Sequence, residues 1–437
     1  MSLVTEVETP SKRSVWVDPD FRRLWRASTI SLFGTNVGEF ALPLLAILTL
    51  SASPSELGLL RGAQFLPFLL LTLPLGVLVD RVAKRPLMVL SDIGRFVFVG
   101  SIPVLIWAGV DEIGVVALLV FLSGCLTVLY QLANFAILPT LIDQDLIVEA
   151  NGKLSATASA NEIAGGGAGG VIVELLTAPV AVLVDAVTYL LSAMSLWRIT
   201  PRETIRDALG RRSPLSEVRE GLATAVRNRY IRPLLGEATT FNLFNEVFVI
   251  GLLLFAPREL GLGPASIGAV FVAGGLGSFV GAWFGARVTD RFGYGRVLLL
   301  TMLVGNGAPV GVAVIGDGQA VALSVLVGIF VLMGVGIGIA NVHAISLRQT
   351  AVPAELRSRV NAAYRLFSWG ALPLGAALGG IVAAGFGART AMMVGAVGVA
   401  SATCWVAFSA IPRLRSIREA QCELLPARDG CPSRLHR

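Results

Sequence analysis

Long apolar stretches dominate the pattern of hydrophobic and polar positions in this chain. About twelve of them are each close to the roughly 20 residues that an α-helix needs to cross a bilayer. They cover residues 24–50, 55–79, 86–109, 113–138, 154–176, 179–197, 233–256, 265–286, 296–315, 319–344, 361–384 and 389–411. The 179–197 stretch is the shortest, and Gly and Pro interrupt 296–315. The pattern predicts an all-α membrane protein with twelve transmembrane helices.

The composition agrees with this prediction. Of 437 residues, 54% are hydrophobic and 15% are charged, whereas a soluble domain carries about 25% charged residues. The mean hydropathy is +0.75. The net charge of +6 does not indicate nucleic-acid binding, because Lys and Arg lie mainly between the apolar stretches, where the positive-inside rule places them.

The positions of Lys and Arg also predict the orientation of the chain. With the N-terminus inside, nearly all of the 35 Lys and Arg fall in cytoplasmic segments. Arg61, Arg258 and Arg389 are expected on the outer side of the membrane, and Arg95 lies within a span. We expect a multi-pass protein of the bacterial inner membrane with both termini in the cytoplasm. The first apolar stretch is long enough to span the bilayer, so we expect no cleavable signal peptide.

The sequence repeats itself at a step of 210 residues. Pro54 and Gly58 recur as Pro264 and Gly268, and the limits of the apolar stretches superpose at the same step. Such a duplication is typical of transporters with two pseudo-symmetric halves. We expect a cytoplasmic tail, a six-helix bundle, an amphipathic or disordered linker, a second bundle and a second tail, at residues 1–20, 21–197, 198–232, 233–411 and 412–437.

Familiar enzyme motifs are absent or misplaced. The run from Gly165 to Gly170 matches G-x-G-x-x-G, but both of its flanks are predicted membrane helix, whereas a dinucleotide site needs a strand before the motif. We find no phosphate-binding loop, zinc-binding helix motif or nucleophile elbow. The sequence therefore predicts a protein that is not an enzyme and that uses no cofactor and no metal.

A charged, basic turn lies between the second and third spans. It reads Gly76-x-Leu78-x-Asp80-Arg81-x-x-Lys84-Arg85, with a partial echo at Asp290-Arg291-x-Gly293. This turn resembles the signature of the major facilitator superfamily. Ala41 to Leu45, Ser91-Asp92-x-x-Arg95, Ala150-Asn151 and Asp185-Ala186 are similar to its drug:proton antiporter branch, which includes macrolide and siderophore exporters. The resemblance covers about residues 21–412.

The resemblance implies a central cavity lined by helices one, four, seven and ten. Those spans do carry polar residues, and in several cases the two halves match at the 210-residue step. Because polar side chains on a span face protein or water rather than lipid, we expect a substrate and proton cavity lined by Asn36, Glu39, Gln131, Asn134, Glu162, Asn242, Asn245, Glu246 and Asn341.

Glu39 and Glu246 are the main candidates for a proton or cation site. Each is expected about 15–20 Å from the cytoplasmic end of its helix, near mid-membrane. Burial favours a neutral carboxyl group, so protonation is a means of coupling conformation to release of a cationic substrate. The alternative is a carboxyl group that only hydrogen-bonds a neighbouring helix. Glu162 is a second-rank candidate for coupling.

The resemblance implies that the charged turns gate conformational switching rather than bind substrate. The residues concerned are Gly76, Asp80, Arg81, Arg85, Asp92, Arg95, Asp290 and Arg291. Asp92 and Arg95 are one helical turn apart, so they form either a local ion pair or part of a cluster with Asp80 that latches the halves together.

Taken with the resemblance, the residues predict a monomeric secondary transporter that exports a lipophilic small molecule, such as a drug, antibiotic or siderophore, against inward proton flow. Multidrug resistance would be the cellular role. Two alternatives stay open: an uptake carrier or facilitator for a metabolite or lysolipid, and a non-transporting membrane receptor with the same fold.

Overall fold

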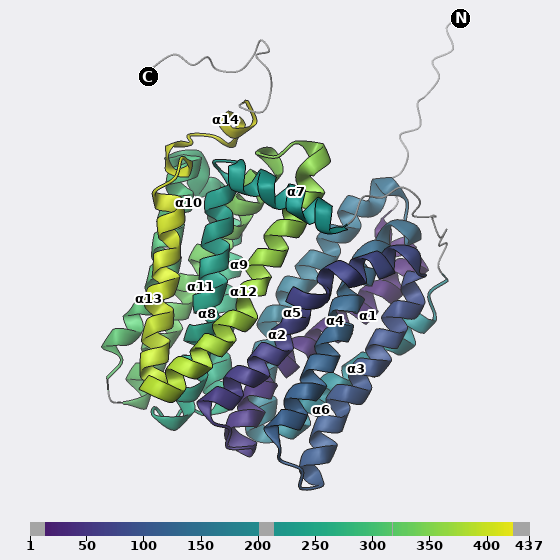
Figure 1. The fold of residues 1–437 in the computed structure, drawn as a ribbon, viewed down its shortest axis with the longest axis vertical. Coiled ribbons are helices and arrows are strands. Elements are labelled where there is room, and N and C mark those ends of the chain that lie inside the picture. Colours follow the sequence, from purple (N-terminus) through teal and green to yellow (C-terminus); the bar gives the residue numbers. More distant parts are fainter. Residues whose placement is uncertain (1–13, 201–213, 317, 423–437) are drawn as a thin grey trace, which may run out of the picture.

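The computed structural model describes residues 14–200, 214–316 and 318–422, and within these ranges the chain is helical throughout its regular structure. Eleven of the described helices are long and apolar enough to cross a membrane. The remaining long helix, α5, packs among them and carries more polar residues. The helices stand side by side in two bundles (Figure 1). The prediction of an all-α, twelve-helix membrane protein is confirmed.

The first bundle holds α1 to α6 and the second holds α8 to α13. The first comprises α1 Pro19–Leu44, α2 Pro54–Arg81, α3 Lys84–Trp107, α4 Ile113–Leu141, α5 Ile147–Leu175 and α6 Ala178–Trp197. The second comprises α8 Ile231–Arg258, α9 Pro264–Phe292, α10 Tyr294–Gly307, α11 Gln319–Thr350, α12 Arg357–Phe386 and α13 Ala388–Ala407. Short elements join them: η1 Val15–Val17, η2 Leu45–Thr49, η3 Gln144–Leu146, η4 Ala308–Val314, η5 Ala354–Leu356, η6 Ile411–Arg413 and α14 Ile417–Cys422.

The helix limits follow the sequence repeat closely. α6 and α13 begin and end 210 residues apart, and so do the first residues of α2 and α9. Both α2 and α9 begin with a proline, whose fixed backbone angle and missing N–H suit the first helical position. In α10 the α-helix gives way to a 3-10 turn at Ala308, just before Pro309. The predicted interruption of the 296–315 stretch therefore has a local cause.

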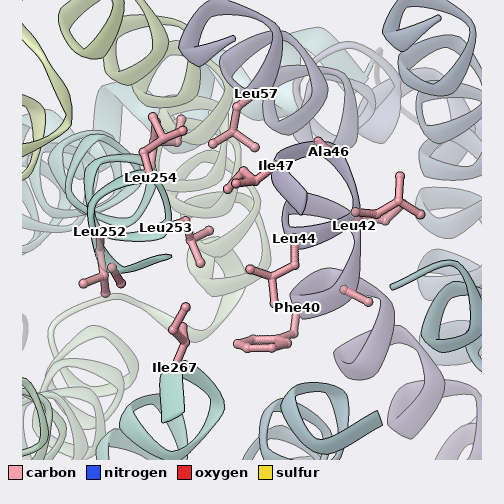
Figure 2. Packing of buried hydrophobic residues seen from close by; sticks show 14 of the residues in the cluster. Phe40, Leu42, Leu44, Ala46, Ile47, Leu57, Leu252, Leu253, Leu254 and Ile267 are labelled. Atoms are coloured by element: carbon pink, nitrogen blue, oxygen red, sulfur yellow. The ribbon is translucent and has the colours of Figure 1, made fainter. Parts of the chain in front are cut away.

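The two described ends of the chain lie on one face of the bundle, which we call the terminal face; the other is the opposite face (Figure 1). A buried apolar cluster toward the opposite face draws on both halves, and Figure 2 shows Phe40, Leu44 and Leu57 of the first half near Leu253 and Ile267 of the second. Toward the terminal face the buried clusters separate, one within each half. The two halves are thus held by a shared core at the opposite face.

Glycines allow the helices to meet there at very short distances. A Cβ atom on Gly58 would lie 2.8 Å from the carbonyl oxygen of Ala376, so α2 and α12 touch through their backbones. A Cβ atom on Gly170 would lie 2.7 Å from the carbonyl oxygen of Pro264, which joins α5 to α9. The glycine run in α5 therefore serves close helix packing, in keeping with its exclusion as a dinucleotide motif.

The linker contributes one further helix, α7, from Pro214 to Arg227. Glu220 of α7 forms an ion pair of 2.9 Å with Arg359 of α12, and Val218 and Ala225 are buried. The second part of the expected linker is thus an amphipathic helix that lies on the second half. Residues 201–213, and the parts of the expected tails at 1–13 and 423–437, lie outside the described ranges.

Candidate functional site

Four charged side chains from both halves converge near the middle of the bundle. They are Glu39 of α1, Arg61 of α2, Glu162 of α5 and Glu246 of α8, and we call them the inter-half charge cluster. Glu39 interacts electrostatically with the other three. With every carboxyl group ionised, three negative charges face one positive charge. The cluster then carries an excess of negative charge.

An ion pair within this cluster joins the two halves. The Arg61 guanidinium donates from Nη2 to both carboxylate oxygens of Glu246, at 2.9 and 3.0 Å, and from Nε at 3.3 Å. The two side chains are only 9% and 5% exposed. Removing either partner would leave a buried unpaired charge, which is far more costly than losing a surface pair.

The placement of Arg61 corrects the sequence prediction, which assigned this residue to the outside. α2 begins seven residues earlier, at Pro54, so Arg61 lies within the helix. Its Nη1 donates to Gln64 at 3.3 Å, and its guanidinium lies 4.9 Å from the ring centre of Phe65. A buried charge needs a partner, and Glu246 supplies one that only the packing of the two halves reveals.

Glu39 lies deeper than expected. α1 begins at Pro19, before the apolar stretch, so Glu39 is about 30 Å along the helix at 1.5 Å per residue. Glu246 lies about 22 Å from the first residue of α8, near the middle of that helix. Glu39 and Glu162 are exposed, whereas Glu246 is buried. Glu39 interacts electrostatically with charged groups of α2 and α5 in its own half and of α8 in the other half.

A polar stripe on α5 leads from the terminal face toward Glu162. Asn151, Ser155, Ser159 and Glu162 are all exposed and follow one another at helical spacing along one face. Lipid would leave such groups without hydrogen-bond partners. This stripe therefore marks a surface in contact with water, and it explains why α5 is the long helix that falls short of the apolar composition of the others.

Other predicted cavity residues serve helix contacts within one half. Asn36 donates to the carbonyl oxygen of Leu32 at 2.8 Å, Asn134 accepts from Ser28 at 3.3 Å, and Asn242 donates to the carbonyl oxygen of Ser368 at 2.7 Å. These amides hold neighbouring turns and helices together. Asn245 is half-buried and Asn341 is exposed.

Gln131 instead reaches the second half. Its side-chain oxygen accepts from Arg365 of α12 at 2.8 Å. The Arg365 guanidinium also lies over the ring of Trp369, at 4.5 Å, and that ring packs against Phe68 of α2 with centroids 5.3 Å apart. A second set of polar and aromatic contacts thus bridges the halves between the inter-half charge cluster and the terminal face.

Four phenylalanines, three buried and one half-buried (Phe271), form a layer next to Glu39. Phe40 packs against Phe271, Phe271 against Phe330, and Phe330 against Phe248, with centroids 5.9, 5.2 and 6.2 Å apart. They come from α1, α9, α11 and α8, and belong to the core shared by both halves. This layer was not predicted, because the apolar pattern alone does not show which phenylalanines of distant helices meet.

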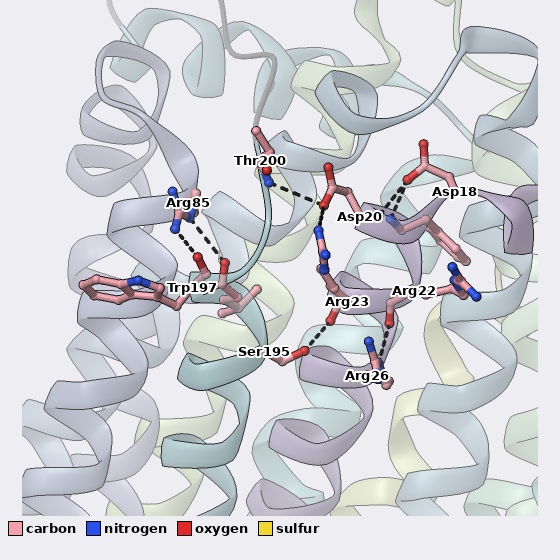
Figure 3. Close-up of polar contacts among 11 residues, drawn as sticks. Asp18, Asp20, Arg22, Arg23, Arg26, Arg85, Ser195, Trp197 and Thr200 are labelled. Carbon is pink, nitrogen blue, oxygen red and sulfur yellow. Dashed lines mark hydrogen bonds and ion pairs between the residues drawn. The ribbon is translucent and has the colours of Figure 1, made fainter.

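The charged turn after α2 places its residues at the terminal face. Gly76 is half-buried, and Asp80 and Arg81 are exposed. Arg85 donates to the carbonyl oxygens of Leu196, at 3.3 Å, and Trp197, so it caps the last turn of α6 (Figure 3). This contact ties α3 to α6 within the first half. A neighbouring set ties α1 to α6, where Ser195 donates to the carbonyl oxygen of Arg23 and Asp20 accepts from Thr200.

The remaining predicted gating residues lie in two places. Asp92 and Arg95 form the local ion pair expected from their spacing, and both are buried inside the first half. Arg291 is exposed near the end of α9. The side chain of Asp290 lies outside the described part of the chain.

Comparison with known proteins identifies the family. The profile of the transmembrane secretion effectors of the major facilitator superfamily matches residues 14–428. A multidrug efflux pump, Tap, of Mycolicibacterium fortuitum is 26% identical over 406 residues, which are 88% of this chain and 93% of that protein. An uncharacterised MFS-type transporter, YfiS, of Bacillus subtilis is 26% identical over 380 residues, which are 85% and 88% of the two chains.

Solved structures share the fold. A nucleoside transporter, NupG, superposes with a TM-score of 0.68 at 11% identity, over 89% of this chain and 97% of that one. A bacterial homologue of the iron transporter ferroportin, in an inward-facing state, superposes with a TM-score of 0.66 at 16% identity, over 90% and 99%. This chain belongs to the transmembrane secretion effector family of the major facilitator superfamily and is a membrane transporter rather than an enzyme.

Proposed function

We propose that this transporter exports a lipophilic small molecule across the bacterial inner membrane in exchange for protons, by alternating access and as a monomer. Both termini would lie in the cytoplasm, in keeping with the distribution of Lys and Arg. The observation that carries the proposal is the inter-half charge cluster, in which three carboxyl groups and one guanidinium come from four helices of both halves.

The excess of carboxyl groups gives the cluster its coupling chemistry. Glu39 and Glu162 are exposed, and Arg61 is the single positive charge of the cluster. Because Arg61 is already paired with Glu246, these two carboxyl groups are not fully neutralised. A cationic substrate and a proton would then compete for the same negative charge. Protonation of Glu39 removes the attraction for a bound cation, so that the cation leaves as the proton arrives.

The conformation described here is closed toward the opposite face, where both halves share one core. In the proposed orientation the terminal face, where each half has its own buried cluster, is the cytoplasmic one. Opening the opposite face must separate α2 from α8 and so must break the Arg61–Glu246 ion pair. Breaking this pair is therefore part of the proposed change of conformation. The charged turns around Asp80 and Arg81 would control the reverse movement at the terminal face.

The first test is an efflux screen in a bacterial host that lacks its own pumps. Cells are loaded with ethidium as the probe, a lipophilic cation, and the loss of fluorescence is followed with and without an uncoupler. We expect efflux that depends on this transporter and stops with the uncoupler. Passage that persists without a proton gradient favours the facilitator or uptake carrier, and no flux of any compound in a wider panel favours the receptor.

The second test uses purified protein. Addition of ethidium in weakly buffered solution should release protons from the wild type and not from Glu39→Gln. Asp145→Asn is the matched control, since this exposed acid lies in η3, away from the inter-half charge cluster. If Glu39→Gln releases as many protons as Asp145→Asn, Glu39 does not carry the coupling proton.

A further inference from the structure

A second polar site lies inside the first half and approaches the inter-half charge cluster at Gly38, the residue before Glu39. Among the described residues, buried side-chain atoms without a protein hydrogen-bond partner gather there, with Arg348 the one exception. They are Ser91 Oγ, Asp92 Oδ2, Arg95 Nε, Tyr130 Oη, Asp185 Oδ1 and Ser192 Oγ, all from α3, α4 and α6. A buried polar atom without a hydrogen-bond partner destabilises the fold, so the concentration of such atoms in one place sets this site apart.

Arg95 stands at the centre of this site. It pairs with Asp92, and its guanidinium lies between the rings of Tyr130 and Tyr189, at 4.4 and 4.2 Å from their centres. The Tyr189 hydroxyl lies 3.4 Å from Asp185 Oδ2 and 3.1 Å from the hydroxyl of Thr35. A continuous polar path therefore runs from Asp92 on α3 to α1.

The charges of this site do not balance when both acids are ionised. Asp92 and Arg95 neutralise each other in direct contact, which leaves the charge of Asp185. This residue is 3% exposed, and its carboxyl group accepts one long hydrogen bond, from the Tyr189 hydroxyl at 3.4 Å, while its other oxygen has no partner among the described residues. The charged groups that act on it are Arg95, already paired, and Glu39, which repels a negative charge. A lone ionised carboxylate in such a place is costly, and a proton removes the cost.

The second half carries different residues at the matching positions. At the 210-residue step, Met302 stands for Asp92, Gly305 for Arg95, Gly395 for Asp185 and Val399 for Tyr189. The same pair of helices, α10 and α13, is joined instead by a buried hydrogen bond from Asn306 to Thr403 at 3.2 Å, and Asn306 also donates to Glu237 of α8 at 3.1 Å. The Asp92–Arg95 pair and Asp185 are therefore particular to the first half.

We propose that Asp185 is a proton-binding site buried in the first half, and that it exchanges its proton with Glu39. Asp185 packs directly on Gly38, the residue before Glu39: a Cβ atom on Gly38 would lie 2.1 Å from Asp185 Oδ2. The proton leaves the Asp185 carboxyl group through the Tyr189 hydroxyl, which lies 3.4 Å from it, and reaches the Glu39 carboxylate, one residue after Gly38. Asp185 becomes the carboxylate and Glu39 the acid, with no other reactant. The exchange step rests on the proposed proton coupling; the buried proton does not.

Infrared spectroscopy tests the buried proton without any transport. Purified full-length protein in lipid nanodiscs at neutral pH should show the C=O stretch of protonated carboxyl groups, and Asp185→Asn should lose part of it. Glu237→Gln is the matched control, because it removes another buried acid, in the second half, and should leave the Asp185 component in place. Absence of the band from the wild type, or an unchanged band in Asp185→Asn, overturns the proposal.

Thermal stability gives an independent answer through a second pair of variants. If Asp185 is neutral, Asp185→Asn replaces one neutral side chain by another of the same shape, and the Tm should stay close to that of the wild type. Asp92→Asn leaves Arg95 buried without its counter-charge and should lower the Tm clearly. An equal loss in both variants means that Asp185 is ionised, which contradicts the proposal.

The exchange step is tested by proton release on addition of ethidium. The wild type should release protons faster than Tyr189→Phe, which keeps the ring over Arg95 but lacks the hydroxyl. Equal release rates overturn the route through Tyr189. If the wild type releases no protons, both the exchange step and the proposed proton coupling are refuted. The infrared experiment still tests whether Asp185 is protonated, because it does not depend on transport.

Discussion

Breaking the Arg61–Glu246 ion pair should open the opposite face of the transporter. In Glu246→Gln the guanidinium of Arg61 keeps its buried position but loses its counter-charge. Removing one partner of a buried pair costs about 3–5 kcal/mol. The closed conformation bears this cost, because only there do α2 and α8 bring the two side chains together.

The lower end of that range, about 3 kcal/mol, corresponds to more than a hundredfold change in an equilibrium constant, since about 1.4 kcal/mol is worth a factor of ten. The fraction of molecules open at the opposite face should therefore rise by about a hundredfold. Replacing both partners by methionine removes the charge and its partner together, and should restore the equilibrium to within a few-fold of the wild type.

The assay follows a cysteine at position 57. Leu57 is fully buried in the shared core, one turn before Arg61, so Leu57→Cys in a background without the four native cysteines should react with a membrane-impermeant maleimide only when the opposite face opens. Glu246→Gln should speed this labelling about a hundredfold. Glu237→Gln is the control, because Glu237 bonds Asn306 within the second half. Labelling within twofold of the wild type in Glu246→Gln, or equally fast labelling in the double variant, would refute the reasoning.

Three further substitutions probe other contacts. Gly170→Leu should abolish transport without loss of expression, because a side chain there meets the backbone of α9 at 2.7 Å, while Gly166→Ala, with 3.7 Å of room, should be tolerated in the same efflux assay. Arg365→Ala should change the labelling equilibrium by less than about 1 kcal/mol, because its bond to Gln131 is exposed; a larger change would show that this contact is a true latch. Arg85→Ala should lower the stability of the first half by about 1 kcal/mol through loss of the α6 cap, measured by thermal unfolding, and an unchanged Tm would contradict that role.

The sequence was sufficient for the architecture because the bilayer imposes it. Helix lengths are set by membrane thickness. Because the duplication has no gaps, the limits of α6 predict those of α13. The Asp92–Arg95 pair followed from spacing within one helix. Contacts between distant helices had no such signal. Arg61 appeared as an outside charge, since its burial depends on how α2 and α8 meet, which no local pattern records.

The layer of phenylalanines beside Glu39 has a consequence for energy conservation. A carrier that couples two flows wastes its gradient whenever ions slip past the substrate. Water and hydrated ions enter a narrow apolar constriction reluctantly. In the proposed exchange mechanism, the rings of Phe40, Phe271 and Phe330 would therefore insulate the carboxyl groups from the opposite face, and removing one of these rings should raise the proton leak in the absence of substrate.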